Sequence, residues 1–485
     1  MPQATTPTPT PSTARPLPPL LVALWRLLAA HRSATRQQRV FDRLRAVVLG
    51  WLLTAARARH TLSQSLLSLG LVDTDPSAFY RLARAGRVDV AALERCFFRQ
   101  TLAAFPATAP YPVVLDGVQF PRASQRMPGT AWLPCPRTPP WKRGPHRAQC
   151  FVHLAALLPG VARLRRALPL RLLPAFGAKA VPGAAPAQTE AQAGLAQVCW
   201  VRRELDAADR TEQWVLGVGD AHYETVGIWR DLPEQTILVA RTAKNRALWA
   251  LPPAGAHKNR KYGEQALHPQ EWLRVRTGWT TIRLDVRGHR VRLVYRVAGP
   301  FLRRGAANRP LFLLVIRGAR WQGGRRTRRE PSFLLVNATK DAAGQWVLPL
   351  PAAELLAWAW QRWEIEVTHR GMKHDAGVGQ VQSWSAAHTV QAVQLQAWAY
   401  AVWLLAGHRA WGEGQSPGPV RSRWWDGGRR WSVATLLRGY VAAFVRSALP
   451  LPGRAARQGW WEEIEAWLHE VDAQLAAQGE EERAA

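Results

Sequence analysis

Apolar residues recur every three or four positions in the first part of the chain, with arginines on the opposite face. This spacing predicts helices over Leu21–Ala30 and Val40–Ala58. Two shorter helices, Leu62–Leu69 and Pro76–Ala85, are predicted on either side of a turn at Gly70. The pair favours either a helix-turn-helix that reads DNA or an ordinary helical bundle with a basic, solvated face. Arginines on or just after the second helix suit both interpretations: Arg81, Arg84 and Arg87.

From Tyr111 onward, short apolar runs replace the helical pattern. Val113–Leu115 and Trp214–Val218 each read as a buried strand, and helix is predicted between them over Ala187–Leu205. Further strands are predicted in three stretches: Gln149–Leu158, Leu164–Leu173 and Thr236–Ala240. Strands that alternate with helices are typical of an α/β sheet with partly buried strands.

Residues 251–344 change the pattern again, to strict alternation of apolar and charged positions. Ile282, Leu284 and Val286 form one arm of a predicted hairpin, and Gly288-His289 provides its turn. Helix resumes at Ala352 and is expected to run to about Lys373, and the remainder is predicted to be mainly helical. The segment Glu462–Ala485 is acidic; such ends are usually solvated, although it could also shield a basic surface or face a partner.

These patterns divide the chain of 485 residues into six regions. They are a disordered Pro/Thr-rich tail (1–20), a helical N-terminal DNA-binding domain (21–107), the first part of an α/β core (108–250), a β-rich insertion (251–344), a core helix (345–385) and a helical C-terminal region with an acidic end (386–485).

The charge balance indicates a polyanionic partner. The chain holds 65 Lys and Arg against 34 Asp and Glu, a net charge of +31. Nucleic acid is the partner that such a surface favours, and an anionic membrane is the competitor. The longest apolar stretches are too short to span a bilayer, and the N-terminus lacks the pattern of a signal peptide. The cysteines have no CxxC or zinc spacing, so a cytoplasmic protein with reduced thiols is expected.

Two aspartates follow apolar runs and carry the first chemical signal. Asp116 and Asp220 are each predicted to end a strand, and each precedes a small residue. In a parallel α/β sheet, ligands bind at the strand ends, so neighbouring strands would bring both carboxylates to one edge. A turn or cap is the ordinary role of either aspartate alone. Two close anions favour a bridging divalent cation, and oxygen ligands suit Mg²⁺ or Mn²⁺.

Glu366 supplies a third carboxylate on the helix predicted after residue 352. Spacings of four and seven residues place Arg362, Glu366 and Lys373 on one helix face. Glu364 is expected to point elsewhere and to be solvated. A plain salt bridge on a helix face is the alternative for this cluster.

These motifs together resemble the bacterial insertion-sequence DDE transposases of the branch with a Y-x2-R-x3-E-x6-K signature, the insertion-sequence-four-like superfamily. Arg362, Glu366 and Lys373 match its last three positions, whereas Ala359 stands where the family has tyrosine. Residues 115–122 (LDGVQFPR) resemble the strand of the first Asp, and residues 218–223 (VGDAHY) resemble the region of the second.

The resemblance implies an RNase H-like core in which Asp116, Asp220 and Glu366 hold two Mg²⁺ or Mn²⁺ ions. It implies cleavage at transposon ends and strand transfer into target DNA, with Arg362 and Lys373 on the flanking phosphates. Two DNA ends imply at least a dimer in the synaptic complex. A nuclease without strand transfer and an inactive, transposase-derived DNA-binding protein are the alternatives.

Further basic residues are candidates for DNA contact in two places. Arg241, Lys244 and Arg246 follow a predicted core strand, and a loop carries Lys142, Arg143 and Arg147. Among 25 tryptophans, Trp279 and Trp321 could stack on a flipped base, although core packing is the commoner role. Residues 423–431 interleave cations with aromatics, as a single-strand binder or a buried connection would. No motif for zinc, a P-loop or a dinucleotide is present, so no nucleotide cofactor is expected.

Overall fold

The computed structural model describes residues 18–54, 58–82, 87–135, 144–160, 164–183, 185–257, 259–286, 289–321, 330–381, 383–412, 414, 430–446, 466, 469–470 and 472–473. The predicted tail lies almost wholly outside these residues. No described helix is both long enough and apolar enough to cross a membrane.

The N-terminal part is helical, as predicted, and the second of the two short helices is a single turn in the described residues. Its helices are α1 (Pro19–Ala29), α2 (Gln38–Leu53), α3 (Leu62–Ser68), α4 (Ser77–Tyr80) and α5 (Val90–Thr101). Side chains cap two of them, because Thr61 and Asp89 accept hydrogen bonds from the first turns of α3 and α5. Of the predicted Pro76–Ala85, the described residues 76–82 contain one helical turn, Ser77–Tyr80, anchored by buried Phe79. One turn is too short to lie along a major groove, so the described residues favour the bundle.

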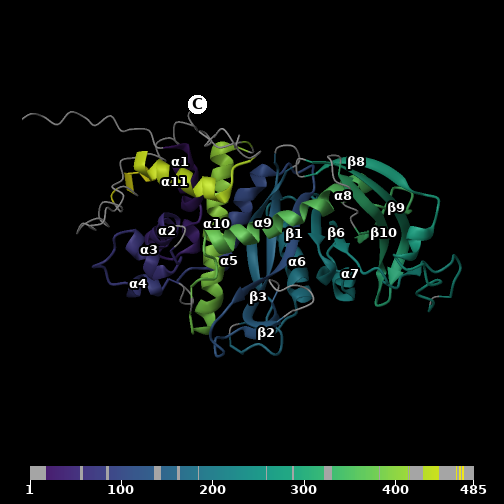
Figure 1. The fold of residues 1–485 in the computed structure, drawn as a ribbon, viewed down its shortest axis with the longest axis horizontal. Helices are drawn as coiled ribbons and strands as arrows, with labels where there is room; N and C mark the ends of the chain where they lie inside the picture. Colours follow the sequence, from purple (N-terminus) through teal and green to yellow (C-terminus); the bar gives the residue numbers. More distant parts are fainter. Residues whose placement is uncertain are drawn as a thin grey trace, which may run out of the picture.

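A five-strand core lies at the centre of the molecule (Figure 1). Its strands are β1 (Tyr111–Pro121), β3 (Pro145–Leu158), β4 (Arg166–Pro174), β5 (Val215–Gly219) and β6 (Thr236–Arg241). Their spatial order is β4-β3-β1-β5-β6, in which β3 runs antiparallel to its neighbours and β1, β5 and β6 are parallel. The patterns predicted an α/β sheet, and this strand order agrees with the RNase H-like core that the family resemblance implied. The strand β2 (Thr130–Pro134) adds a hairpin arm to β3, and α6 (Glu190–Asp206) and α7 (Val226–Asp231) connect the later strands.

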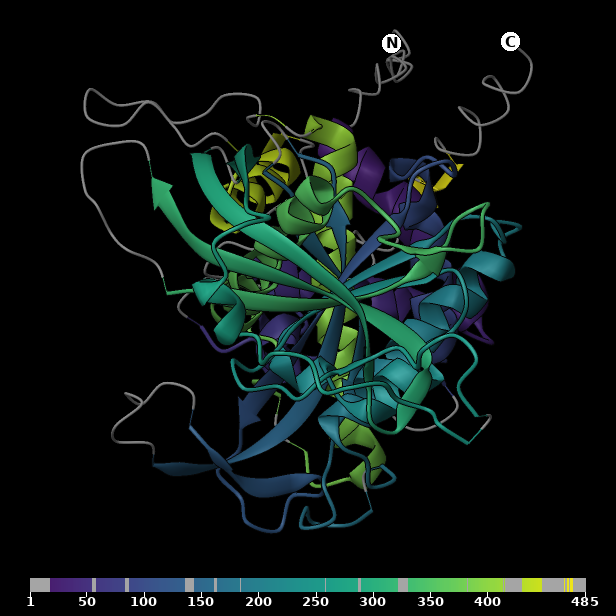
Figure 2. The same ribbon diagram turned by 90° about the vertical axis from the view of Figure 1, so that its right-hand side faces the viewer.

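The predicted β-rich insertion is not a separate layer. Its strands are β7 (Trp249–Ala250), β8 (Thr280–Val286), β9 (His289–Arg303), β10 (Ala306–Trp321) and β11 (Ser332–Asn337), followed by the short pair β12 (Thr339–Lys340) and β13 (Trp346–Val347). The hairpin β8–β9 forms, although His289 pairs with Val286 as the first residue of β9 and is not part of the turn as predicted. The strand β11 pairs with β6, so one 11-stranded sheet runs through both regions. The physical reason is that β6 would otherwise leave an unpaired edge. Figure 2 shows this continuous, twisted sheet.

The two faces of the sheet are covered by different helices. On β1, Val114 packs with Ile365 of the helices α8 (Ala352–Gln361) and α9 (Trp363–Arg370), whereas Val113 and Leu115 belong to the core on the other face. Side chains alternate between faces along a strand. Val114 and Asp116, two residues apart, therefore point to the same face, and the contact of Asp116 with Arg362 places that face toward α9.

A long buried helix, α10 (Ala386–Trp411), separates the N-terminal helices from the sheet (Figure 1). It packs on α1, α5 and β4, and α11 (Val433–Arg446) packs beside it. Most of its residues are buried, which explains an apolar sequence on nearly every side.

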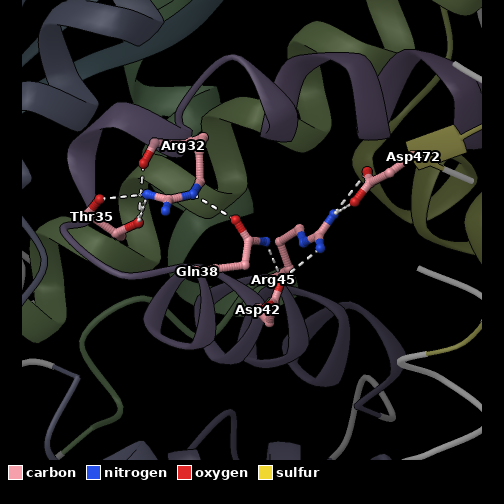
Figure 3. A network of polar contacts seen from close by, with 6 residues as sticks. All are labelled: Arg32, Thr35, Gln38, Asp42, Arg45 and Asp472. Carbon is pink, nitrogen blue, oxygen red and sulfur yellow. Dashed lines mark hydrogen bonds and ion pairs between the residues drawn. The ribbon is translucent and has the colours of Figure 1, made fainter. Parts of the chain in front are cut away.

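A buried arginine joins the acidic C-terminal segment to the N-terminal helices (Figure 3). Arg45 on α2 is almost fully buried and donates to Asp42 at 2.6 Å and to both carboxylate oxygens of Asp472 at 2.8 and 2.9 Å. At this residue the acidic end is therefore a partner of the fold rather than a solvated tail.

We expect Asp472→Asn to destabilise the protein by about 2 kcal/mol, because it removes half of the countercharge of a buried guanidinium. Thermal unfolding of the full chain measures this. Asp285→Asn is the control, since its ion pair with Arg290 is exposed on both sides and should contribute about 0.5 kcal/mol or less. Equal melting temperatures for the two variants would contradict the assignment.

Candidate active site

Asp116 and Asp220 lie on neighbouring parallel strands at the same level. The register pairs Val114 with Val218, so each aspartate stands two residues beyond a paired valine on the same face. Asp220 directly follows β5, as predicted. Asp116 does not end its strand: β1 continues to Pro121 because β3 keeps pairing with it, with His153 opposite Asp116. The prediction of a strand end at Asp116 was wrong, whereas the prediction of neighbouring parallel strands is confirmed.

Asp116 is largely buried, and its two oxygens have different partners. Oδ1 accepts from the backbone N–H of Gly117 at 3.0 Å, and Oδ2 lies 3.5 Å from a guanidinium nitrogen of Arg362. Burial raises the pKa of Asp116 to about 7; the charge of Arg362 opposes this shift, and the carboxylates of Asp220, Glu366 and Glu190 add to it. Burial and the three neighbouring carboxylates together outweigh the charge of Arg362, so the charged form of Asp116 is disfavoured.

Arg362 connects Asp116 to Glu366. It lies between α8 and α9 with helical dihedrals, so the predicted spacing of four residues holds, and its second terminal nitrogen donates to Glu366 Oε1 at 2.6 Å. The helix then widens into a π-helical turn, Gly371–Asp375, a feature that often marks functional sites. Lys373 lies on this turn, 5.5 Å from the ring centre of Phe120 on β1.

Asp220 begins a short 3-10 turn, Ala221–Tyr223. Its Oδ1 accepts from the backbone N–H of His222 at 2.8 Å, and its Oδ2 lies 3.1 Å from Nδ1 of the same histidine. The hydrogen bond to Asp220 raises the pKa of His222, whose ring is mostly exposed. His222 was not among the predicted site residues. Its position two residues after a strand-end aspartate is the sequence feature that could have indicated it.

Glu364 is not solvated, contrary to expectation. Its side chain is 1% exposed and pairs with Arg430 at 2.8 Å. The helical periodicity of α9 explains this. Arg362 and Glu366, four residues apart, face the aspartates, while Glu364, Ile365 and Thr368 lie on the side that faces the interior. Arg430 and the buried Trp431 are thus structural, and residues 423–429 lie outside the described part of the chain.

Two buried histidines stand behind Asp116. The rings of His153 and His369 lie 5.0 Å apart, and neither ring nitrogen of His153 has a hydrogen-bond partner among the described residues. Burial lowers the pKa of His153 to about 3, so it is neutral near pH 7.

His153 should therefore make stability fall in acid. The unfolded chain binds its proton below pH 6.5 and the folded chain does not, so stability is full above pH 6.5 and is lost toward pH 3. At pH 4.5 we expect a cost of about 2–3 kcal/mol. His153→Phe should reduce the difference in melting temperature between pH 7 and pH 4.5. An unchanged difference would show that His153 titrates normally.

The basic residues proposed for DNA contact differ in their surroundings. Arg241, the last residue of β6, and Lys244, in the loop that follows, are exposed. Arg246 instead pairs at 2.8 Å with the buried Glu224, which also binds Arg303. Arg147 donates to Thr130 and to the carbonyl of Gln125. Lys142 and Arg143 lie outside the described residues.

The two tryptophans that were candidates for base stacking also differ. The indole of Trp279 is partly buried, donates to the carbonyl of Val275 and carries the guanidinium of Arg317 at 3.9 Å, which favours a packing role. The side chain of Trp321 lies outside the described part of the chain.

The donor set at this edge fits a hard divalent cation in its chemistry. Asp116, Asp220 and Glu366 offer carboxylate oxygens of the kind that Mg²⁺ and Mn²⁺ prefer. Arg362 partly neutralises their charge, because its guanidinium lies between Asp116 and Glu366, where a metal ion would bind. Among the described residues, no three acidic, histidine or cysteine side chains converge closely enough to hold an ion.

Comparison with known proteins gives structural and sequence relationships. A cryo-EM structure of a piggyBac transposase synaptic complex with hairpin DNA is 12% identical, with a TM-score of 0.37, and the match covers 96% of this chain and 87% of that one. No curated protein sequence matches the chain. The family model of DDE superfamily endonucleases matches residues 28–297, which is more than half of the chain and includes Asp116 and Asp220. The chain belongs to the DDE superfamily endonucleases.

Proposed function

We propose that the protein is the DNA transposase of a bacterial insertion sequence, in the Y-x2-R-x3-E-x6-K branch of the DDE enzymes. It cleaves DNA at the transposon ends and transfers the ends into target DNA. One observation carries the proposal: Arg362 binds Asp116 and Glu366 at the sheet edge where Asp220 occupies the matching position of the next parallel strand. The family match ends at residue 297, so the assignment of Glu366 rests on this contact and on the signature spacing.

Asp116, Asp220 and Glu366 would hold two Mg²⁺ or Mn²⁺ ions. When bound, such a pair activates the attacking water or DNA 3′-hydroxyl and stabilises the leaving oxygen. The near-neutral pKa of Asp116 matches this role. Burial and the neighbouring carboxylates disfavour its charged form, and a bound cation would stabilise that form.

Arg362 and Lys373 bind the phosphates that flank the scissile bond. In the structure the guanidinium of Arg362 neutralises two of the site's carboxylates, and its planar fork can bind a phosphate equally well. Transfer of this side chain from carboxylate to phosphate would free Asp116 and Glu366 when DNA arrives. Lys373, near Phe120, extends the positive charge along β1.

The proposal is tested with labelled transposon-end DNA, target DNA and Mg²⁺. Joined product supports a transposase. Cleavage without joining would identify a nuclease, and binding without either reaction would identify an inactive derivative. Joining requires two ends, so a dimeric complex is expected on DNA.

DNA binding should weaken steeply with salt, because neutralised phosphates release counterions. Arg241→Ala and Lys244→Ala should each lower the slope of log K against log salt by about 1, since both side chains are exposed. Arg246→Ala is the matched control and should change the slope less, because Glu224 already neutralises Arg246. A flat salt dependence of the wild type would argue against the DNA role.

A further inference from the structure

A fourth carboxylate, Glu190, lies close enough to Asp116 and Asp220 for their charges to interact. It is the first residue of α6, and its Oε1 accepts a hydrogen bond from the hydroxyl of Tyr223 at 3.2 Å. Tyr223 itself ends the turn that begins at Asp220. Glu190 thus reaches the sheet edge from the face opposite α9.

Three glycines make room for this pair. A Cβ atom at Gly117, the residue after Asp116, would stand 2.6 Å from Oε1 of Glu190. A Cβ atom at Gly194 or Gly219 would meet the ring of Tyr223 at 2.5 or 2.9 Å. None of the three glycines has a positive φ, so backbone conformation does not require them. Glycine is required at these positions because the Glu190 carboxylate and the Tyr223 side chain occupy the space that a Cβ atom would take.

The start of α6 does not need Glu190. Thr189 and Gln192 form a complete capping box, in which each side chain binds the other's backbone N–H. Among the described residues, no Lys or Arg forms an ion pair with Glu190. Its neighbours in charge are Asp220 and His222, and burial raises its pKa. A half-buried acid without a dedicated cation is costly unless a cation arrives.

We infer that Glu190 is a fourth carboxylate ligand of the divalent-cation site, held in place by Tyr223 and admitted by Gly117. The inference rests on the proposed function, because it adds a ligand to the site formed by Asp116, Asp220 and Glu366. Four carboxylates would spread the coordination of two ions over both faces of β1. Tyr223 is a positioning residue, since its hydroxyl donates to the ligand rather than to the cation.

The test measures Mn²⁺ binding by the full chain, with electron paramagnetic resonance of the free ion as the readout. DNA binding is measured on the same samples. Glu190→Gln keeps the size and the hydrogen-bond acceptor for Tyr223 but removes the charge. It should weaken Mn²⁺ binding by about tenfold or more. Tyr223→Phe should give a smaller loss. Glu94→Gln is the control, because this buried acid of α5 pairs with Arg171 on β4, and its replacement should leave Mn²⁺ affinity unchanged.

A second variant guards against a purely structural effect. Gly117→Ala retains every carboxylate but places a methyl group against the flexible end of Glu190, so it should weaken Mn²⁺ binding without unfolding the protein. In the Glu190→Gln background the same change should have little further effect. Wild-type Mn²⁺ affinity in Glu190→Gln, with a loss in Asp116→Asn, would overturn this inference alone. Unchanged affinity in Asp116→Asn as well would overturn the proposed function.

Discussion

Replacing Asp116 or Asp220 by asparagine, or Glu366 by glutamine, is expected to lower Mg²⁺-dependent DNA cleavage at least about a thousandfold. Each change removes one carboxylate from the proposed cation site while preserving its shape. A loss of about 4 kcal/mol of transition-state stabilisation corresponds to that factor. Binding to transposon-end DNA should remain, because the exposed basic surface is untouched. Cleavage rates and end binding are measured on the same preparations.

Thermal unfolding of the same variants shows whether a loss of cleavage comes from a loss of folding. Asp116 is buried with a pKa raised to about 7, so its charge costs stability, and Asp116→Asn should unfold at the wild-type temperature or above it. Asp231→Asn is the control for activity, because Asp231 is exposed and pairs with its neighbour Arg230. Cleavage at the wild-type rate in any of the three site variants would remove that residue from the proposed mechanism.

Glu364→Gln, two residues from Glu366, is expected to reduce stability instead. Removing one partner of a buried ion pair leaves the other charge uncompensated, which costs about 3 kcal/mol or more. Among the described residues, Arg430 would keep its bond to the carbonyl of Arg165 but lose the negative charge that faces it. Thermal unfolding should show a clearly lower melting temperature, and cleavage per folded molecule should stay within a few-fold of wild type.

These two neighbouring glutamates therefore separate the two roles of α9. If Glu364→Gln abolished cleavage at full stability while Glu366→Gln stayed active, the register assigned to this helix would be wrong. The comparison needs no other structural information, since both side chains come from the same turn.

The sequence was informative wherever one local pattern decided the outcome. The apolar runs before Asp116 and Asp220 predicted neighbouring parallel strands, and the four-residue spacing predicted the contact between Arg362 and Glu366. Both results follow from the period of a strand or helix alone. Membership in the DDE endonucleases agrees with the resemblance seen in those motifs.

Features that depend on distant partners were not predicted. The strand through Asp116 continues because β3 pairs with it, and β11 joins the core sheet because β6 offers an edge. Glu364 is buried because Arg430, 66 residues away, lies against α9. Glu190 escaped notice since its signal is spread over Gly117, Gly194 and Gly219, which touch it or its tyrosine only in the folded chain. Charge and periodicity carry no information about such contacts.

The central claim is that acidic side chains from β1, β5 and α9 surround divalent cations. Anomalous scattering from Mn²⁺ in crystals of the protein bound to transposon-end DNA tests it most directly. We predict two peaks about 4 Å apart, each with oxygens of Asp116, Asp220 or Glu366 within about 2.5 Å. Peaks confined to other residues, in crystals that cleave their DNA, would contradict the assignment of this site.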